Sequence, residues 1–167
     1  MKISMYALSV GQFLPMLNNL RNLLDKAVAN ATTRKFDPNI LATARLAPDM
    51  FGLIRQVQIA CDLAKNSTAR LAGLEPPRFE DNETTIDEIK ARIDKTIAYI
   101  KTVPANAIDG QEDRDIKIPL RETTLEMKGL PFLQTWALTN FYFHVVTTYN
   151  ILRQNGVDIG KRDYLGN

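Results

Sequence analysis

The residues that are best suited to binding or catalysis lie at four-residue steps near the carboxyl end of the chain. Trp136, Asn140, His144 and Thr148 follow one another at this spacing, so in a helix they form one ridge. His144 is the only histidine of the chain. We expect its imidazole to point at a polar pocket, where a lone histidine more often completes a hydrogen-bond network than binds a metal.

A metal site is the alternative interpretation of the same ridge. Helical bundles build metal sites from side chains on facing helices, often with two ligands one turn apart, which is the spacing of Asn140 and His144. Carboxamides are neutral and weak ligands, so His, Asn and Gln would hold a divalent ion far less tightly than three imidazoles would. Asp62 or Asp49 could supply an anionic ligand, although solvated or capping roles are more common for such residues.

A second group of polar residues shares one face of an earlier segment. Arg55, Gln58 and Asp62 recur at three- and four-residue steps, which brings them together if the segment is helical. They would form an internal polar network or bind a small polar ligand, and the network is the more common outcome.

Other catalytic patterns are missing. One histidine, with no Ser or Cys in a nucleophile turn, gives a hydrolytic triad little support, and no glycine-rich phosphate loop precedes a helical segment. The single cysteine, Cys61, has apolar neighbours, which is typical of a small buried residue.

The elements that must position these residues have the periodicity of helices. An apolar stripe runs through residues 5–31, and Pro15 either starts this helix or kinks it. The next helix is expected over residues 48–71, begun by Pro48 and Asp49. It is apolar around much of its circumference, which predicts a central, buried position.

The connection after this second helix is long. It passes Pro76 and Pro77 and reaches about Asn82, a length that a crossover between parallel helices would need. Thr85 and Glu88 then have the spacing of a capping box and begin the third helix.

The spacing of apolar residues in the last third of the chain changes twice, first to the alternation of strands and then back to the spacing of a helix. Alternating apolar residues between Pro104 and Gly129 predict a small hairpin or extended excursion. The fourth helix begins at Pro131 and reaches Asn155, with Gly156 just past its end. Together these elements predict an all-α fold with four main helices.

The composition fits one globular domain over residues 1–167. Hydrophobic residues make up 45% of the chain and charged residues 24%, and about 100 to 200 residues usually form one domain. The net charge of +2 comes from 21 basic and 19 acidic residues, mixed along the chain, so nucleic-acid binding is not indicated. No stretch approaches the ~20 apolar residues of a membrane span and no signal-peptide core is recognisable, so we expect a cytoplasmic protein.

The helix order, the crossover and the final helix resemble the DinB/YfiT-like superfamily. A branch of it known only as a domain of unknown function is more similar, through PDMF at residues 48–51, RQVQIA at 55–60 and NFYFH at 140–144. The resemblance covers nearly the whole chain. It implies a four-helix bundle with up-down-down-up topology that is commonly a homodimer.

The resemblance also implies where a metal would bind. In metal-binding members, one histidine on the second helix and an HxxxH pair on the fourth hold a divalent ion, which activates a thiol or water for transfer or hydrolysis. The pair falls on Asn140 and His144, and the second-helix histidine falls on Gln58, so one of three histidines is kept. We therefore expect no cofactor, with Zn, Ni or Mn as the possible metals if one binds.

Three hypotheses follow from the residues and the resemblance, and they leave open whether the protein is an enzyme. The first is a degenerate metal pocket that serves a small-molecule-binding or structural role. The second is a divalent-metal-dependent thiol transferase or hydrolase, and the third is a homodimeric interaction module. The pocket candidates are His144, Asn140, Gln58, Asp62, Arg55, Trp136 and Thr148, and the candidate metal ligands are His144, Asn140 and Gln58.

Overall fold

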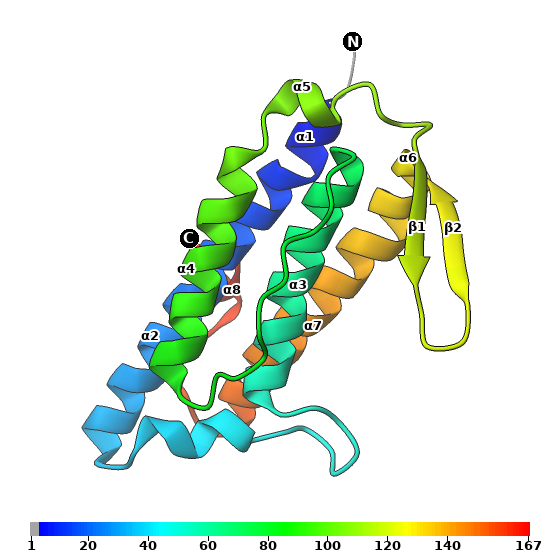
Figure 1. Ribbon diagram of the computed structural model, residues 1–167. Coiled ribbons are helices and arrows are strands. Elements are labelled where there is room, and N and C mark those ends of the chain that lie inside the picture. The colour runs from blue at the N-terminus through cyan, green and yellow to red at the C-terminus, as the bar shows by residue number, and fades with distance from the viewer. Residues whose placement is uncertain (1–3) are drawn as a thin grey trace.

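The computed structural model describes residues 4–167, and most of these residues are helical (Figure 1). The long helices are α2 (Val10–Arg34), α3 (Leu53–Leu71), α4 (Ile86–Thr102) and α7 (Leu138–Gln154). Shorter helical pieces are α1 (Met5–Leu8), η1 (Pro38–Thr43), α5 (Ala105–Ile108), α6 (Gly129–Pro131), η2 (Phe132–Ala137) and α8 (Lys161–Leu165). The strands are β1 (Asp115–Pro119) and β2 (Thr124–Lys128).

Helix α3 has the central position among the long helices. It packs against α4 on one side and α7 on the other, while α2 contacts α4, α7 and α3. Figure 1 shows that α3 and α4 run in the same direction, because the segment 72–85 returns along them before α4 begins. Helices α2 and α7 run the opposite way. We call residues 72–85 the crossover.

The central position of α3 follows from its composition. Leu53, Val57, Ala60 and Cys61 are fully buried, as the apolar pattern predicts. Polar residues of α3 are buried as well, among them Gln56, Gln58 and Lys65. Because buried polar groups need partners, α3 is the element that a site would be built on.

The prediction that Pro48 and Asp49 begin this helix is wrong. Helix α3 begins at Leu53, whose backbone N–H donates to the carbonyl of Ala44 at 2.9 Å. The preceding Gly52 passes so close to η1 that a Cβ there would lie 3.0 Å from a backbone oxygen of Thr43. Tertiary contact with η1 therefore sets the start of α3.

The first helical segment begins at Met5, as predicted, but it is divided into α1 and α2. Helix α2 starts at Val10 and continues through Pro15. The helix is interrupted at Ser9, whose hydroxyl donates to the carbonyl of Met5 at 2.7 Å. Pro15 lies in the second turn of α2, where its missing N–H removes one hydrogen bond without ending the helix.

The capping box of α4 is confirmed. The hydroxyl of Thr85 accepts from the backbone N–H of Glu88 at 3.2 Å, and the Glu88 carboxylate accepts from the N–H of Thr85 at 2.9 Å. Each side chain thus satisfies a free N–H at the helix start.

The expected hairpin is also present. Strands β1 and β2 are antiparallel, and Ile116 pairs with Met127 and Ile118 with Leu125. These residues share one face, and it packs on the core, whereas the intervening residues are exposed. Gly129 closes the hairpin against the backbone of Gln111, where a Cβ would lie 2.2 Å from the carbonyl oxygen.

The fourth helix starts at the expected place but is not uniform. After α6, residues 132–137 form a π-helix before α7 continues as a regular α-helix. It ends just before Gly156, which has a φ of 83°. No helix within residues 4–167 is long and apolar enough to cross a membrane.

Candidate functional site

His144 on α7 is held by a glutamine on α3. The Nδ1 atom of His144 lies 2.7 Å from Oε1 of Gln56, and Nε2 of Gln56 donates to the carbonyl of Phe51 at 3.1 Å. An amide oxygen only accepts, so this hydrogen-bond pattern assigns the ring proton to Nδ1 of a neutral imidazole. Helix α7 supplies the ring and the start of α3 fixes its tautomer.

The environment keeps His144 neutral. Burial, together with the positive charge of Arg55, lowers the pKa of His144 from 6.5 to about 4. Its Nε2 has no hydrogen-bond partner among the described residues. This atom is also absent from their buried polar atoms that lack a partner, so it is accessible to solvent. The ring therefore presents one accessible acceptor at neutral pH, and it is too weak a base to be an efficient proton carrier.

The partner of His144 on α3 is Gln56, and not Gln58, the residue that matches the second-helix metal position. A helix turns about 100° per residue, so Gln56 and Gln58 point roughly 200° apart and only one can face His144. The structure gives this place to Gln56. Gln58 instead donates to Glu83 of the crossover at 2.8 Å and accepts from Arg55 at 3.1 Å.

The other polar residues of the predicted ridge bond to their own helix. The side-chain amide of Asn140 donates to the carbonyl of Trp136 at 2.7 Å, and the hydroxyl of Thr148 donates to the carbonyl of His144 at 2.9 Å. Such bonds to the preceding turn are common for short polar side chains in helices. Trp136 is partly buried against the core.

The donor set does not fit the metal that the superfamily resemblance implies. Gln58 is engaged by Arg55 and Glu83, and the amide nitrogen of Asn140 is bound to backbone, so one imidazole is left. Within residues 4–167 no group of three His, Cys, Asp or Glu side chains could hold a metal ion. A single imidazole with neutral amides is a weak divalent site.

The face of α3 that carries Asp62 belongs to a buried ion cluster centred on Arg92 of α4. Nη2 of Arg92 lies 3.0 Å from Asp62 and 2.8 Å from Asp81, and Nη1 lies 3.1 Å from Glu83. The Arg92 side chain is only 1% exposed. Burial acts to lower the pKa of Arg92, but the three carboxylates outweigh it and raise this pKa above its ordinary value.

Cations and an aromatic ring complete this cluster. Lys65 of α3 lies 2.9 Å from Asp62, and its ammonium is 4.4 Å from the ring centre of Phe79. The ammonium of Lys95 approaches the same ring at 4.1 Å. We use "ion cluster" for Asp62, Lys65, Asp81, Glu83 and Arg92; it fastens the crossover to both parallel helices.

Sequence reasoning missed Arg92 as a central residue. A usable signal exists, because Arg92 lies on the buried isoleucine stripe of α4, beside Ile89 and Ile93. A charge at such a position needs buried partners. Cys61, by contrast, is fully buried as predicted, and burial raises the pKa of its thiol to about 12.

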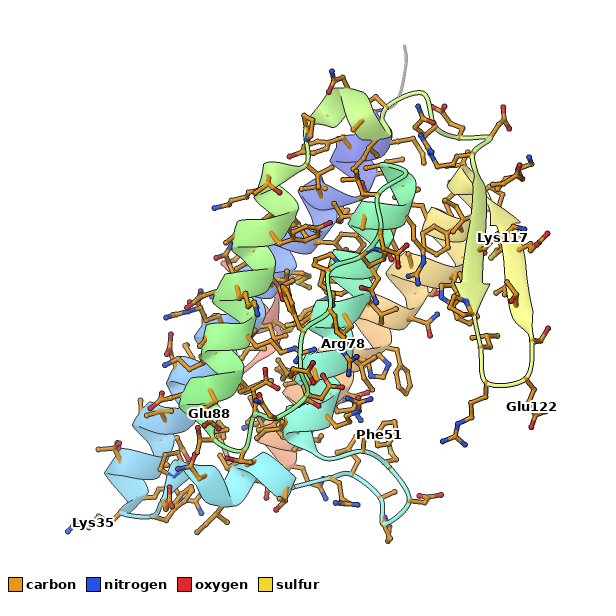
Figure 2. The ribbon with its side chains drawn as sticks, viewed as in Figure 1. Lys35, Phe51, Arg78, Glu88, Lys117 and Glu122 are labelled. Carbon is orange, nitrogen blue, oxygen red and sulfur yellow. The ribbon has the colours of Figure 1, made fainter. Side chains whose placement is uncertain are left out.

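A cleft of about 370 Å³ opens beside this cluster, between η1, the first turn of α3 and the crossover. It is lined by Ala42, Thr43, Arg45, Gly52, Ile54, Arg55, Gln58, Asp81, Glu83 and Thr84. Figure 2 shows Phe51 at the same end of the molecule, and Arg78 where the crossover passes in front of α3. Of the predicted pocket residues, the structure thus brings Arg55 and Gln58 together at the cleft. Asp62 joins the neighbouring ion cluster, and His144 lies near Arg55.

Fold and site together define a DinB-like, mostly helical protein. A crystal structure of a DinB family member protein from Shewanella denitrificans, at 1.83 Å resolution, matches with a TM-score of 0.87. The two chains are 42% identical, and the match covers 97% of this chain and 92% of that one. None of the curated proteins matches. Residues 5–165 match the family described as a domain of unknown function, DUF1993, and the chain belongs to this family.

Proposed function

We propose that this protein is a single-domain DinB-type four-helix bundle, with up-down-down-up topology, that binds a small polar molecule without a metal ion. The site is the cleft beside Arg55. One observation carries the proposal: the amides at two of the three metal-ligand positions, Gln58 and Asn140, are engaged by other groups of the protein, while the polar face of α3 lines an open cleft. A few convergent polar groups in a concave site are what small-molecule recognition requires.

Binding is better supported than catalysis by the chemistry of the available groups. With a pKa of about 4, His144 is a neutral acceptor at pH 7 and contributes little as a general base. The Cys61 thiol, with a pKa of about 12, is buried and protonated, so it is no nucleophile. Arg55, in contrast, is partly exposed at the cleft and offers hydrogen-bond donors to a ligand.

Two measurements test this function together. Elemental analysis of untagged protein purified without chelator, repeated after incubation with Zn, Ni and Mn, is expected to show no stoichiometric metal. A thermal-shift screen of small polar molecules is expected to find compounds that raise the melting temperature through Arg55 but not through the exposed hairpin residue Arg121. Arg55→Gln should abolish the rise, and Arg121→Gln should retain it.

A different result would favour the metal-dependent transferase or hydrolase. Stoichiometric metal in the wild-type protein that is lost in His144→Ala would contradict the proposal. It would show that His144 and further ligands converge in solution. A melting temperature unchanged by any compound would remove the binding function and leave a structural role.

A specific surface favours a second, compatible function, which is self-association into a homodimer. Phe51 and Phe143 are 57% and 56% exposed, and both lie next to the Gln56–His144 pair. Exposed aromatic side chains are typical of interfaces. We expect a melting temperature that rises with protein concentration, an effect that Phe143→Asp removes. Leu74→Asp, at a position that is 50% exposed beyond the other end of α3, should retain it.

A further inference from the structure

Asp81 of the crossover bridges two arginines of different exposure. Its Oδ1 lies 2.8 Å from Nη2 of Arg92, and its Oδ2 lies 2.5 Å from Nη1 of Arg55. The Arg92 side chain is 1% exposed, whereas the side chains of Arg55 and Asp81 are 43% and 37% exposed. One carboxylate therefore has a buried partner and a partner at the wall of the cleft.

The two halves of this bridge differ in strength. An ion pair between partly exposed side chains is weak, because water and salt compete with it. Removing a partner from buried Arg92 is costly, because the remaining charge is left without compensation. Arg92 also holds Glu83 and Asp62, which keeps the crossover in place. The Arg55 side of the bridge is thus the side that can exchange.

A second cation faces the same cleft. Arg45 lines it and forms no ion pair with any residue from 4 to 167. Glu83 repels an anion in the cleft only weakly, because its carboxylate is bound by both Arg92 and Gln58. Counting the ion cluster with the two cleft arginines gives four cations and three carboxylates, a net charge of +1. These side chains are Arg45, Arg55, Lys65, Arg92, Asp62, Asp81 and Glu83.

We propose that the molecule bound in the cleft carries a carboxylate, which replaces Asp81 on Arg55 while Asp81 remains bound to Arg92. This inference rests on the proposed function, since it names the ligand class of the same site. The planar guanidinium of Arg55 matches a carboxylate, and Arg45 supplies a second donor. Asp81 in the free protein occupies the place of the ligand, so it weakens binding. Ala42 and Ile54 give the cleft an apolar wall for the body of the ligand.

The probe for this inference is benzoate, compared with uncharged benzyl alcohol. Dissociation constants are measured by NMR titration of the full chain. We expect the wild-type protein to bind benzoate more tightly than benzyl alcohol, and Asp81→Asn to bind it more tightly still, by up to about fivefold, since an exposed ion pair no longer competes. Arg55→Gln and Arg45→Gln should each weaken benzoate binding by a larger factor than they weaken the binding of benzyl alcohol.

Asp115→Asn is the matched control. It neutralises a carboxylate that also pairs with a cation, Lys128, at 2.6 Å. Asp115 begins the hairpin, none of whose residues is among those that line the cleft, and Figure 2 shows Lys117 and Glu122 of the hairpin to one side of Phe51. The control therefore makes the same change in net charge without touching the site, and its affinity for benzoate should equal that of the wild-type protein.

The outcomes separate the inference from the function on which it rests. Tighter binding of benzoate by Asp81→Asn, with no change in Asp115→Asn, supports exchange at Arg55. Unchanged or weaker binding in that variant, with wild-type binding intact, overturns the exchange and leaves the binding function. No binding of either compound to any variant overturns both. Should Asp81→Asn fail to fold, the side-chain Nε–H resonance of Arg55 in the wild-type protein decides: it should shift with benzoate, and a static resonance during binding contradicts the inference.

Discussion

Helix α3 buries polar side chains on two faces, and the two differ in charge. Toward α7, Gln56 and His144 share one neutral hydrogen bond of 2.7 Å. Toward α4 and the crossover, Asp62 and Lys65 join Arg92 in the ion cluster. A neutral pair costs little to bury once it is bonded, whereas buried charges are tolerated only when every one has a partner. The ion cluster is therefore suited to fastening the fold, and the neutral pair to leaving an acceptor free.

Removing the central cation should have the largest effect. Arg92→Met leaves Asp62, Asp81 and Glu83 without their shared partner, and we expect a loss of about 3 kcal/mol in the free energy of unfolding, measured with urea. Two of these carboxylates reach solvent, which keeps the loss at the lower end for a broken buried pair. Arg121→Met, at an exposed position of the hairpin turn, should change it by less than about 0.5 kcal/mol.

A small loss in Arg92→Met would mean that the two polar faces of α3 contribute alike to stability. If the free energy of unfolding fell by less than about 1 kcal/mol, the cluster would behave like a surface ion pair. The crossover would then be held mainly by apolar contacts.

The neutral face should give a smaller and more local effect. Gln56→Leu and His144→Leu each remove one partner of a bond, and we expect each to cost about 1–3 kcal/mol. Because the two residues touch, the double variant should cost less than the sum, with a coupling of about 1 kcal/mol. The measurement is a double-mutant cycle by urea unfolding.

Gln58 supplies the control for this cycle. Its side chain bonds to Glu83 and Arg55, so Gln58→Leu and His144→Leu should be additive. Coupling between Gln58 and His144, with none between Gln56 and His144, would restore the pocket that the family resemblance implies and contradict the pairing of Gln56 with His144.

The elements that local chemistry determines could be predicted from the sequence. The Thr85–Glu88 capping box, the alternation of the hairpin and Gly156 after the last helix all depend on residues within a few positions of one another. The start of α3 could not, because Gly52 is fixed by its contact with Thr43 of η1.

The candidate site was predictable only in its residue types. Helical periodicity places Arg55, Gln58 and Asp62 on one face, but it does not say which neighbour that face meets. The facing residues are Asp81, Glu83 and Arg92, which the crossover and α4 supply. For the same reason the choice between Gln56 and Gln58 as the partner of His144 required the packing of α3 on α7.

The smallest expected effect is on pH dependence, and it separates the two faces by titration. The folded pKa of His144 is about 4 and its ordinary value is 6.5. Below pH 6.5 the unfolded chain binds a proton that the folded chain does not bind until about pH 4. The contribution of His144 to stability is therefore complete above pH 6.5 and is lost as the pH falls toward 4. Partial exposure of the ring to solvent makes this loss modest.

The carboxylates of the ion cluster should lose their contribution to stability at a lower pH than His144 does. Burial acts to raise the pKa of Asp81, but Arg55 and Arg92 outweigh it and keep this pKa below its ordinary 3.8, so its contribution is lost below that value. Urea unfolding between pH 7 and about 5 thus isolates His144. His144→Gln retains a donor for Gln56 and carries no titrating proton, so its free energy of unfolding should be flatter than that of the wild-type protein over this range. Parallel curves of the free energy of unfolding against pH would mean that the imidazole is solvated like that of a free histidine. His144 would then not be the neutral acceptor described for this face of α3.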